Sequence, residues 1–581
     1  MEESKCGCCG WCCCSKEDFF PEESFKSWKS YGNALKETKS RLTDRFLARS
    51  QDEEEVNQMR ARSKNEMKKS LTWWDLLWFG IGSVMGAGIF VLTGQEANGH
   101  AGPAVVLSFA VSGFAALLSV FCYTEFAVDI PVAGGSFAYI RVELGDFVAF
   151  VAAGNILFEY VVSGAGVARS FTSYFATLIN FHPDDLRITV EALPQNYNQL
   201  DPIAVAVSVI ICVFVCYSTK MSSRFNTIVT IFHVVLVVFI IVAGLTKANI
   251  TNLTNNFAPF GVRGVFTASA VLFFAYIGFD GVATLAEETK NPVRDIPIGL
   301  LGSMSITIVM YCLLAMTLCL MQPYTSIDEN APYSVAFQAV GMNWAKYLVS
   351  FGAAKAMFTV LLGNLIGQSR YFTHIGRTHM APPWLAIINE KTGTPINATI
   401  VMTLANCIIG FFTDLGVLSS LLSISTLFIF SLVALALLVR RYYVPGETSD
   451  NDRNKLIGFL VLIVGSSAAT AAYWGISKNG WIGYIVTVSI WFLSTLGLKL
   501  MVKESRKPKL WGTPLVPWLP SASIAMNVFL LGSVEGASFI RFAVWSAILL
   551  IYYFLVGLHA SYDSAKEAGQ EKNVADQREM P

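Results

Sequence analysis

Hydrophobic residues gather in long runs that recur along most of this 581-residue chain, with short polar segments between them. About 20 consecutive apolar residues are needed for a helix to cross the hydrocarbon core of a bilayer. The pattern therefore predicts an all-α polytopic membrane protein with about 14 transmembrane helices. The expected spans lie near residues 73–97, 102–128, 147–178, 202–218, 225–246, 265–287, 298–321, 346–369, 397–412, 415–439, 456–475, 481–501, 516–533 and 539–560.

Composition narrows the class of protein further. Hydrophobic residues make up 54% of the chain and charged residues only 14%, whereas a soluble protein of this length would carry far more charge. The formal net charge is zero, so nothing favours a nucleic-acid partner. The polar N-terminus lacks the apolar core of a cleavable signal peptide, and we expect insertion to rely on the first membrane helix.

Lysine and arginine are distributed unevenly between the loops. The tail before the first span ends in RARSKNEMKK, and alternate later loops carry further lysines and arginines. Because cytosolic loops carry the excess of these residues, both tails are expected in the cytosol. We expect a cytosolic, Cys-rich N-terminal tail at 1–70, a ten-helix core at 71–440, four additional membrane helices at 441–562 and a cytosolic C-terminal tail at 563–581.

Two sequons lie in a loop that this topology places outside. Asn249 and Asn252 both begin Asn-X-Thr triplets in ANITNLTNN, and both are candidate glycosylation sites. Asn397 also begins a sequon, but it falls at the cytosolic edge and we expect it to stay unmodified.

The N-terminal tail carries two features of interest. Six cysteines cluster at its start, and Cys12, Cys13 and Cys14 are the lipidation candidates. A tail without any cysteine chemistry and a zinc site are the alternatives, whereas a disulfide framework does not suit the reducing cytosol. The following segment, SFKSWKSYGNALKETKSRLTDRFLARS, is basic and has the composition of an amphipathic surface helix.

Glycines interrupt two of the expected membrane helices. The first span contains GIGSVMGAGIFVLTG, Gly80 to Gly94, and the sixth contains FFAYIGFDG, Phe273 to Gly281. An offset of five helices inverts the second copy, which is typical of inverted-repeat transporters whose broken helices meet at the midplane. Close packing of helices through Gly82 and Gly86 is the alternative explanation for the first run.

A broken helix has chemistry that suits a zwitterion. Unwinding exposes amide hydrogens on one side of the break and carbonyls on the other, and this is tolerated in a membrane only where the backbone lines a cavity. The carboxylate of an amino acid suits the positive helix N-terminus, and its ammonium suits the carbonyls.

Long stretches of the sequence resemble a known family. The matching text includes WWDLLWFGIGSVMGAGIFVLTG, FCYTEFAVDIPVAGGSFAYIRVELGD, LFFAYIGFDGVATLAEETKNPVRDIPIG, KTGTPINAT, STLFIFSLVALALLVRRYYV and WGTPLVPWLPSASI. Here the chain is similar to the cationic amino acid transporters of plants, within the amino acid–polyamine–cation superfamily. The resemblance runs from about Lys16 to Lys566 and implies a five-plus-five inverted-repeat core followed by four extra helices.

The resemblance also implies binding positions. The unwound stretch of the first span would supply amides to the substrate carboxylate; it comprises Ser83, Val84, Met85, Gly86, Ala87, Gly88 and Ile89. In the sixth span, carbonyls of Phe274, Ala275 and Ile277 would receive the ammonium, and the Phe274 ring would act as a gate. Asn364 in the eighth span should face the site, where many relatives have a small or apolar residue, which leaves the substrate range open.

Ionisable residues inside membrane spans are costly and are functional candidates. Glu159 would hold the cationic end of lysine or arginine, or it is a structural acid. His233 matches the position where proton-driven relatives place a titratable side chain, and a core histidine is the alternative. We favour structural, bracing or gating roles for the remaining candidates, which are Lys355, Glu125, Glu287, Glu288 and Asp280.

Together these features predict a secondary active transporter that imports arginine and lysine, with glutamine as a possible neutral substrate, by proton symport and alternating access. A proton-independent facilitator or exchanger of amino acids or polyamines is one alternative, and an amino-acid sensor is another. The expected partners are the amino acid, protons and the lipid bilayer. We expect no enzyme activity, no metal and no cofactor. The plasma membrane is the favoured location, with the vacuolar or another internal membrane as the alternative.

Overall fold

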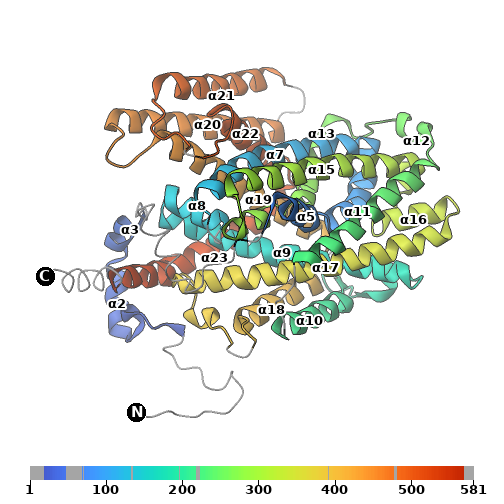
Figure 1. The fold of residues 1–581 in the computed structure, drawn as a ribbon, viewed down its shortest axis with the longest axis horizontal. Helices are drawn as coiled ribbons and strands as arrows, with labels where there is room; N and C mark the ends of the chain where they lie inside the picture. The colour runs from blue at the N-terminus through green and yellow to red at the C-terminus, as the bar shows by residue number, and fades with distance from the viewer. Residues whose placement is uncertain are drawn as a thin grey trace, which may run out of the picture.

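Helices of the computed structural model run side by side along one long direction (Figure 1). The structure describes residues 19–46, 69, 71–131, 135–194, 196–217, 223–389, 392–476, 480–508 and 510–567. In these residues the only strands are β1 (Ile188–Thr189) and β2 (Gln199–Leu200), which pair as a short antiparallel hairpin. The expected all-α polytopic fold is confirmed.

The core contains ten spans, two of which are broken. The first consists of α5 (Trp73–Val84), the π-helical η2 (Gly88–Leu92), α6 (Thr93–Glu96) and η3 (Ala97–Ala101). The sixth consists of α13 (Gly261–Leu272), η6 (Phe273–Tyr276) and α14 (Asp280–Ala283). The others are α7 (Val105–Asp129), α9 (Asp146–Leu178), α10 (Pro202–Tyr217), α11 (Ser223–Leu245), α15 (Pro292–Met321), α17 (Asn343–Arg377), α18 (Ile396–Phe412) and α19 (Leu415–Tyr442).

Four helices follow the core. They are α20 (Asp450–Ile476), α21 (Ile482–Met501), α22 (Trp518–Leu531) and α23 (Gly536–Tyr552), which continues through η10 (Tyr553–Gly557). Figure 1 shows α20, α21 and α22 along one edge and α23 apart from them, close to α9. Gly154 of α9 lies against Leu549 of α23, where an added Cβ would come within 2.5 Å of that side chain. The glycine therefore permits this close packing.

Short helices cover the two ends of the bundle. They are η1 (Glu23–Phe25), α2 (Trp28–Lys36), α3 (Thr38–Phe46), η4 (Gly102–Ala104), α8 (Gly135–Leu144), η5 (Pro183–Leu186), α12 (Ile250–Thr254), η7 (Ala286–Glu288), η8 (Tyr324–Ser326), α16 (Pro332–Ala339) and η9 (Pro383–Ala386). In Figure 1, α12 and α16 lie at the right end, and α2, α3 and α23 lie at the left. Following the charge asymmetry, we name the left end cytosolic and the right end outer.

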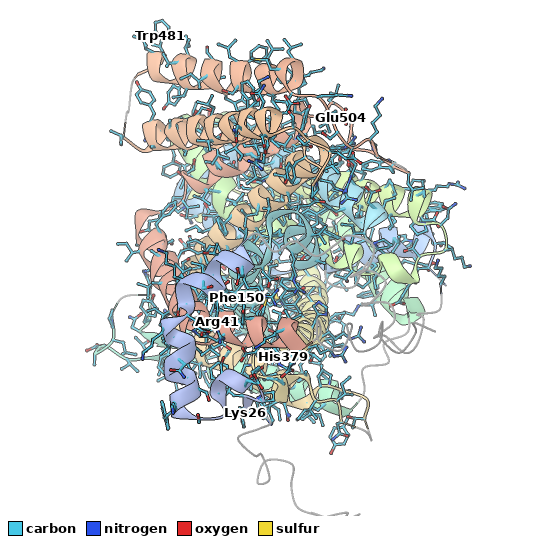
Figure 2. The ribbon with its side chains drawn as sticks, turned by 90° about the vertical axis from the view of Figure 1, so that its left-hand side faces the viewer. Lys26, Arg41, Phe150, His379, Trp481 and Glu504 are labelled. Atoms are coloured by element: carbon cyan, nitrogen blue, oxygen red, sulfur yellow. The ribbon has the colours of Figure 1, made fainter. Side chains whose placement is uncertain are left out.

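Residues 19–46 pack onto the cytosolic end of the bundle (Figure 2). Arg41 forms an ion pair with Asp563 at 3.2 Å, and the backbone amide of Ser24 donates to the same carboxylate at 2.8 Å. Nδ1 of His379 lies 2.5 Å from the carboxylate of Glu22. The part of the N-terminal tail that the structure describes is thus attached to the membrane bundle. The lipidation candidates Cys12, Cys13 and Cys14 lie outside the described residues.

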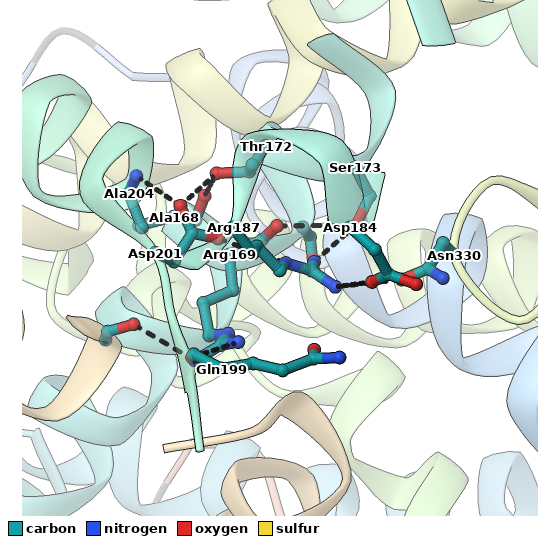
Figure 3. A network of polar contacts seen from close by, with 12 residues as sticks. Ala168, Arg169, Thr172, Ser173, Asp184, Arg187, Gln199, Asp201, Ala204 and Asn330 are labelled. Carbon is teal, nitrogen blue, oxygen red and sulfur yellow. Dashed lines mark hydrogen bonds and ion pairs between the residues drawn. The ribbon is translucent and has the colours of Figure 1, made fainter. Parts of the chain in front are cut away.

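A buried network of polar contacts connects several segments at the outer end of the bundle (Figure 3). The guanidinium of Arg169, in α9, donates to the carbonyls of Thr413 at 2.9 Å and Gln199 at 3.1 Å. Arg187 lies 3.5 Å from the carboxylate of Asp201 and donates to Asn330 at 3.3 Å. The network therefore joins α9 to the strand hairpin, to the end of α18 and to the loop before α16.

Candidate functional site between the two broken helices

Both broken spans leave helical geometry at specific residues. Helix α5 ends at Val84, and Met85 is extended with ψ 95° before the π-helical segment begins at Gly88. In the sixth span Ile277 is extended with ψ 145°, and Gly278 has φ +117°. A φ of this sign is strained for residues with a side chain, so glycine is required at the second break.

The two breaks touch each other. A Cβ added to Gly88 would lie 2.4 Å from Cα of Ala275, and a Cβ added to Gly278 would lie 2.6 Å from the carbonyl oxygen of Ser83. Each break thus carries a glycine at its contact with the other.

Close packing through Gly82 and Gly86 was the alternative explanation of the first run. A Cβ added to Gly82 would lie 2.3 Å from the Thr230 hydroxyl, so close packing and unwinding are both present in this run.

Two buried tyrosines bind carbonyls released near the first break. The hydroxyl of Tyr311, in α15, donates to the Val84 carbonyl at 3.0 Å. The hydroxyl of Tyr174, in α9, donates to the Phe90 carbonyl at 2.7 Å. The sequence analysis did not identify either residue. Their signal is a tyrosine deep within an apolar span, where its hydroxyl requires a partner.

The predicted binding stretch is mostly enclosed. Six of the seven residues in the first-span stretch are buried, from Val84 to Ile89, whereas Ser83 and, in the sixth span, Ile277 are partly exposed. Gly86 faces Val360 of α17, and the Phe274 ring lies near Gly166 of α9. The stretch therefore lies between the other broken helix and the scaffold helices α9 and α17.

Tyr276 belongs to the second break but points away from the first. Its hydroxyl donates to the carbonyl of Phe109 in α7 at 2.9 Å, and its ring packs against Phe109 and Tyr311. These contacts direct its side chain into the helix interface, as the sequence analysis allowed.

Two carboxyl groups stand out near the second break. Glu159, in α9, is buried with 8% of its surface exposed, and Asp280, directly after the break, is partly exposed. Within the described part of the chain, neither carboxyl group forms an ion pair with a lysine, arginine or histidine. Glu159 is thus a buried acid without a basic partner among the described residues, and Asp280 is a second, partly exposed one.

Asn364 presents an unused acceptor. Its side chain is partly buried in α17, and its Oδ1 atom is enclosed without a hydrogen-bond partner. An enclosed polar atom without a partner is costly, and a bound polar ligand would relieve that cost.

His233 lies beside the first broken span. It is 5% exposed, its ring stacks on Phe90 with centroids 5.6 Å apart, and its Nε2 atom has no hydrogen-bond partner. Lys355, in α17, is the charged side chain that interacts electrostatically with His233. The Lys355 ammonium lies 3.4 Å from the Val229 carbonyl and 4.9 Å from the centre of the Phe232 ring, and no acid pairs with it among the described residues.

The other acidic candidates lie away from the breaks. Glu125 receives two hydrogen bonds from Arg441, at 2.7 and 3.0 Å, and a third from the Thr513 amide at 2.7 Å. The carbonyl of Glu288 accepts from the Leu71 amide at 3.0 Å, and the Glu287 side chain is outside the described set. These contacts hold the cytosolic ends of helices together.

The sequons differ in accessibility. Asn249 is exposed and caps α12, with its Oδ1 accepting from Thr251. Asn252 is partly buried, and its Nδ2 atom donates to the Leu320 carbonyl at 3.2 Å. Nδ2 of Asn397 donates to the Trp384 carbonyl at 3.1 Å. Among the residues that the structure describes, no three His, Cys, Asp or Glu side chains lie together as a metal site.

Comparison with known proteins identifies the family to which the chain belongs. Residues 71–450 match the family described as "Amino acid permease", and residues 511–561 match the one described as "C-terminus of AA_permease". The chain is 65% identical to Cationic amino acid transporter 1 of Arabidopsis thaliana, over 98% of this chain and 96% of the relative. It is 58% identical to Cationic amino acid transporter 5, over 95% and 97%, and 54% identical to Cationic amino acid transporter 8, vacuolar, over 97% and 95%, both also of Arabidopsis thaliana.

These relatives cover nearly the whole chain, including both broken spans and all four additional helices. The expected resemblance is confirmed, and the matched families are transporters, so the expectation that the chain is not an enzyme is confirmed as well. The protein is an amino acid transporter that belongs to the plant cationic amino acid transporters of the amino acid–polyamine–cation superfamily.

Proposed function

We propose that this protein imports cationic amino acids, arginine and lysine first, through a site between the two breaks. The observation that carries this proposal is the buried carboxyl group of Glu159, which is 8% exposed and, like the partly exposed Asp280 after the second break, has no basic partner among the described residues. A buried acid without a partner is costly, and a guanidinium or ammonium brought by the substrate supplies the missing charge. The names of the relatives support a cationic substrate.

The backbone of the breaks binds the common part of the substrate. Amides from Ser83 to Ile89 receive the carboxylate, and the carbonyls of Phe274, Ala275 and Ile277 receive the α-ammonium. Broken helices in inverted-repeat transporters offer these groups at the midplane. The unused acceptor of Asn364 adds a polar contact, which leaves room for glutamine as a neutral substrate.

Import is coupled to protons in this proposal, and His233 is the proton site. Histidine is the side chain that titrates near neutral pH, and this one is enclosed next to the first broken span. The membrane potential alone contributes about 2.3 kcal/mol per 100 mV for one positive charge. A co-transported proton adds a second charge and the pH gradient to that driving force.

We place the protein in the plasma membrane, with a glycan on the loop after α11. Relatives whose names include "vacuolar" or "chloroplastic" keep internal membranes as the alternative. Membrane fractionation of the tagged full-length protein separates these locations.

The test is uptake of radiolabelled arginine into transport-deficient cells at external pH 5.5 and 7.5, with and without a protonophore. Lysine, glutamine and spermidine serve as competitors. Proton symport predicts uptake that rises at acid pH in wild type and loses that rise in His233→Gln. Because arginine itself is charged, glutamine uptake is measured in parallel to separate pH coupling from voltage.

Three outcomes would contradict parts of the proposal. Uptake that ignores pH indicates a facilitator, and full competition by spermidine indicates a polyamine substrate. Binding without accumulation indicates a sensor. Unchanged pH dependence in His233→Gln would make His233 a core residue.

A further inference from the structure

Four rings close the outer side of the site, and we call them the outer aromatic cluster: Phe90 of η2, Tyr174 of α9, His233 of α11 and Tyr333 of α16. The Phe90 ring stands edge-on to Tyr174 and to Tyr333, with both pairs of centroids 6.0 Å apart. It stacks on His233 at 5.6 Å with an interplanar angle of 16°. All four residues are buried, so they seal this side against water.

Phe90 is the centre of the cluster and the part that belongs to a broken helix. Its ring contacts the other three rings, and its carbonyl accepts the Tyr174 hydroxyl at 2.7 Å. Because η2 is π-helical and follows an unwound stretch, Phe90 sits on backbone that is already released from regular helical geometry. Movement of this half-helix would carry the ring away from His233.

The loop and helix that bear Tyr333 are held against the same half-helix. A Cβ on Gly94 would come within 2.3 Å of the Asp328 carbonyl, so the two backbones are in close contact. Asn98 donates to the Ile327 carbonyl at 2.9 Å, and Ser350 of α17 donates to Ser334 at 3.0 Å. Helix α16 therefore connects the moving half-helix to the long helix α17.

The charged and titratable groups near His233 decide whether its imidazole can hold a proton. Lys355 of α17 is the charged group that acts on it, and the hydroxyls of Tyr174 and Tyr333 are the other titratable groups of the cluster. An imidazolium in this position would be buried next to a second cation, with its Nε2 atom unpartnered. The closed cluster thus suits a neutral imidazole and disfavours a proton that arrives from outside.

We infer that Phe90, held by Tyr174, is the lid that separates the His233 proton site from the outer solution. This inference rests on the proposed role of His233 in proton coupling. When the outer half of the first span moves away, the stack opens, water reaches the imidazole and a proton binds to it. When the stack forms, the site loses its outer access, so a proton that has bound leaves only towards the cytosol. Phe90 and Tyr174 are positioning residues that prevent a proton leak.

The test uses purified full-length protein in liposomes that contain a pH-sensitive dye, with an acidic outer buffer and the potential set by potassium and valinomycin. Proton entry is measured with and without arginine in wild type, Phe90→Leu and Tyr174→Phe. Tyr174→Phe keeps the ring and removes only the hydroxyl that binds the Phe90 carbonyl. Phe529→Leu and Tyr553→Phe, on α22 and η10, are controls for the loss of a ring and of a buried hydroxyl.

We expect substrate-free proton entry to rise about fivefold in Tyr174→Phe, as the loss of one hydrogen bond predicts, and further in Phe90→Leu. The controls stay at the wild-type rate, and adding His233→Gln to either variant abolishes the increase. If Phe90→Leu does not fold, Tyr174→Phe alone decides the matter. Two results would overturn the inference that Phe90 is a lid. One is a wild-type rate of proton entry in variants that fold and transport, and the other is a leak that persists after His233→Gln is added. Wild-type protein that moves arginine without any proton would refute the proposed coupling, and the lid with it.

Discussion

At the residue scale, the main feature is a pair of acidic side chains whose negative charge no basic side chain among the described residues balances. The buried Glu159 and the partly exposed Asp280 have no basic partner among the described residues, while the buried Glu125 is fully paired. Buried charges in proteins are normally paired, so an exception marks a place where a ligand completes the pair.

Replacing Asp280 tests whether the second acid takes part in cation binding. In Asp280→Asn we expect the KM for arginine to rise about 10- to 100-fold, as the loss of one hydrogen bond to a charged group predicts. Glutamine uptake should change far less. The measurement is concentration-dependent uptake, with exposed Glu191→Gln as the matched control. Equal losses for arginine and glutamine would show that Asp280 only braces the unwound segment.

Glycosylation is also decided at single residues. Asn249 is exposed, whereas the Nδ2 atom of Asn252 donates to the Leu320 carbonyl. We therefore expect Asn249→Gln to remove the glycan and Asn252→Gln to leave it, as judged by mobility before and after glycosidase treatment. The reverse pattern would mean that the loop is modified before it packs against α15.

At the element scale, the two broken helices are held open by their contact with each other and by tyrosines from their neighbours. Glycines permit the approach, and Tyr311 and Tyr174 bind the carbonyls that unwinding releases near the first break. Released backbone groups are tolerated inside a membrane protein only when such partners exist.

Gly278 is the position where a methyl group should do most harm. In Gly278→Ala the side chain meets the Ser83 carbonyl at a φ of +117°, which costs about 1–3 kcal/mol in backbone strain before the clash is counted. We expect a lower melting temperature and loss of uptake. Gly458→Ala, with open space around it in α20, should leave both unchanged. Normal uptake by Gly278→Ala would show that the second break relaxes freely.

The sequence predicted the positions of the membrane helices better than the contacts between them. Apolar runs predicted the spans, because burial in a bilayer requires length and hydrophobicity that are visible locally. Helix α17 runs on to Arg377, past the expected end of the eighth span at 369, because polar residues such as Arg370 and His374 can continue a helix beyond its apolar run. The glycine pattern predicted where the first span breaks. It could not predict that Gly88 touches Ala275, which depends on how two distant helices cross.

At the scale of the whole molecule, polar networks at both ends connect the core to the segments around it. At the cytosolic end, Arg441 joins Glu125 of α7 to Glu504 and, through Glu125, to the Thr513 amide, in the connection between α21 and α22. These pairs join residues far apart in the sequence, and single charges in the sequence do not reveal their partners.

The two acids that pair with Arg441, Glu125 and Glu504, should contribute unequally to the stability of the protein. Glu125→Gln leaves Arg441 buried with less compensation, and breaking a buried pair costs about 3–5 kcal/mol. Glu504 is 37% exposed, and losing an exposed pair costs about 0–1 kcal/mol. We expect a clear drop in the melting temperature for Glu125→Gln and little change for Glu504→Gln. Similar melting temperatures would indicate that water compensates Arg441 in both variants.

The most direct test of the central claim is substrate selectivity in liposomes that contain purified wild-type or Glu159→Gln protein. Arginine and glutamine uptake are compared at one fixed membrane potential, so that voltage favours neither variant. If the Glu159 carboxylate receives the cationic group, Glu159→Gln loses at least about tenfold of its preference for arginine and still transports glutamine. An unchanged preference, with both rates preserved, would contradict a cation site at Glu159 and place substrate selection elsewhere in the protein.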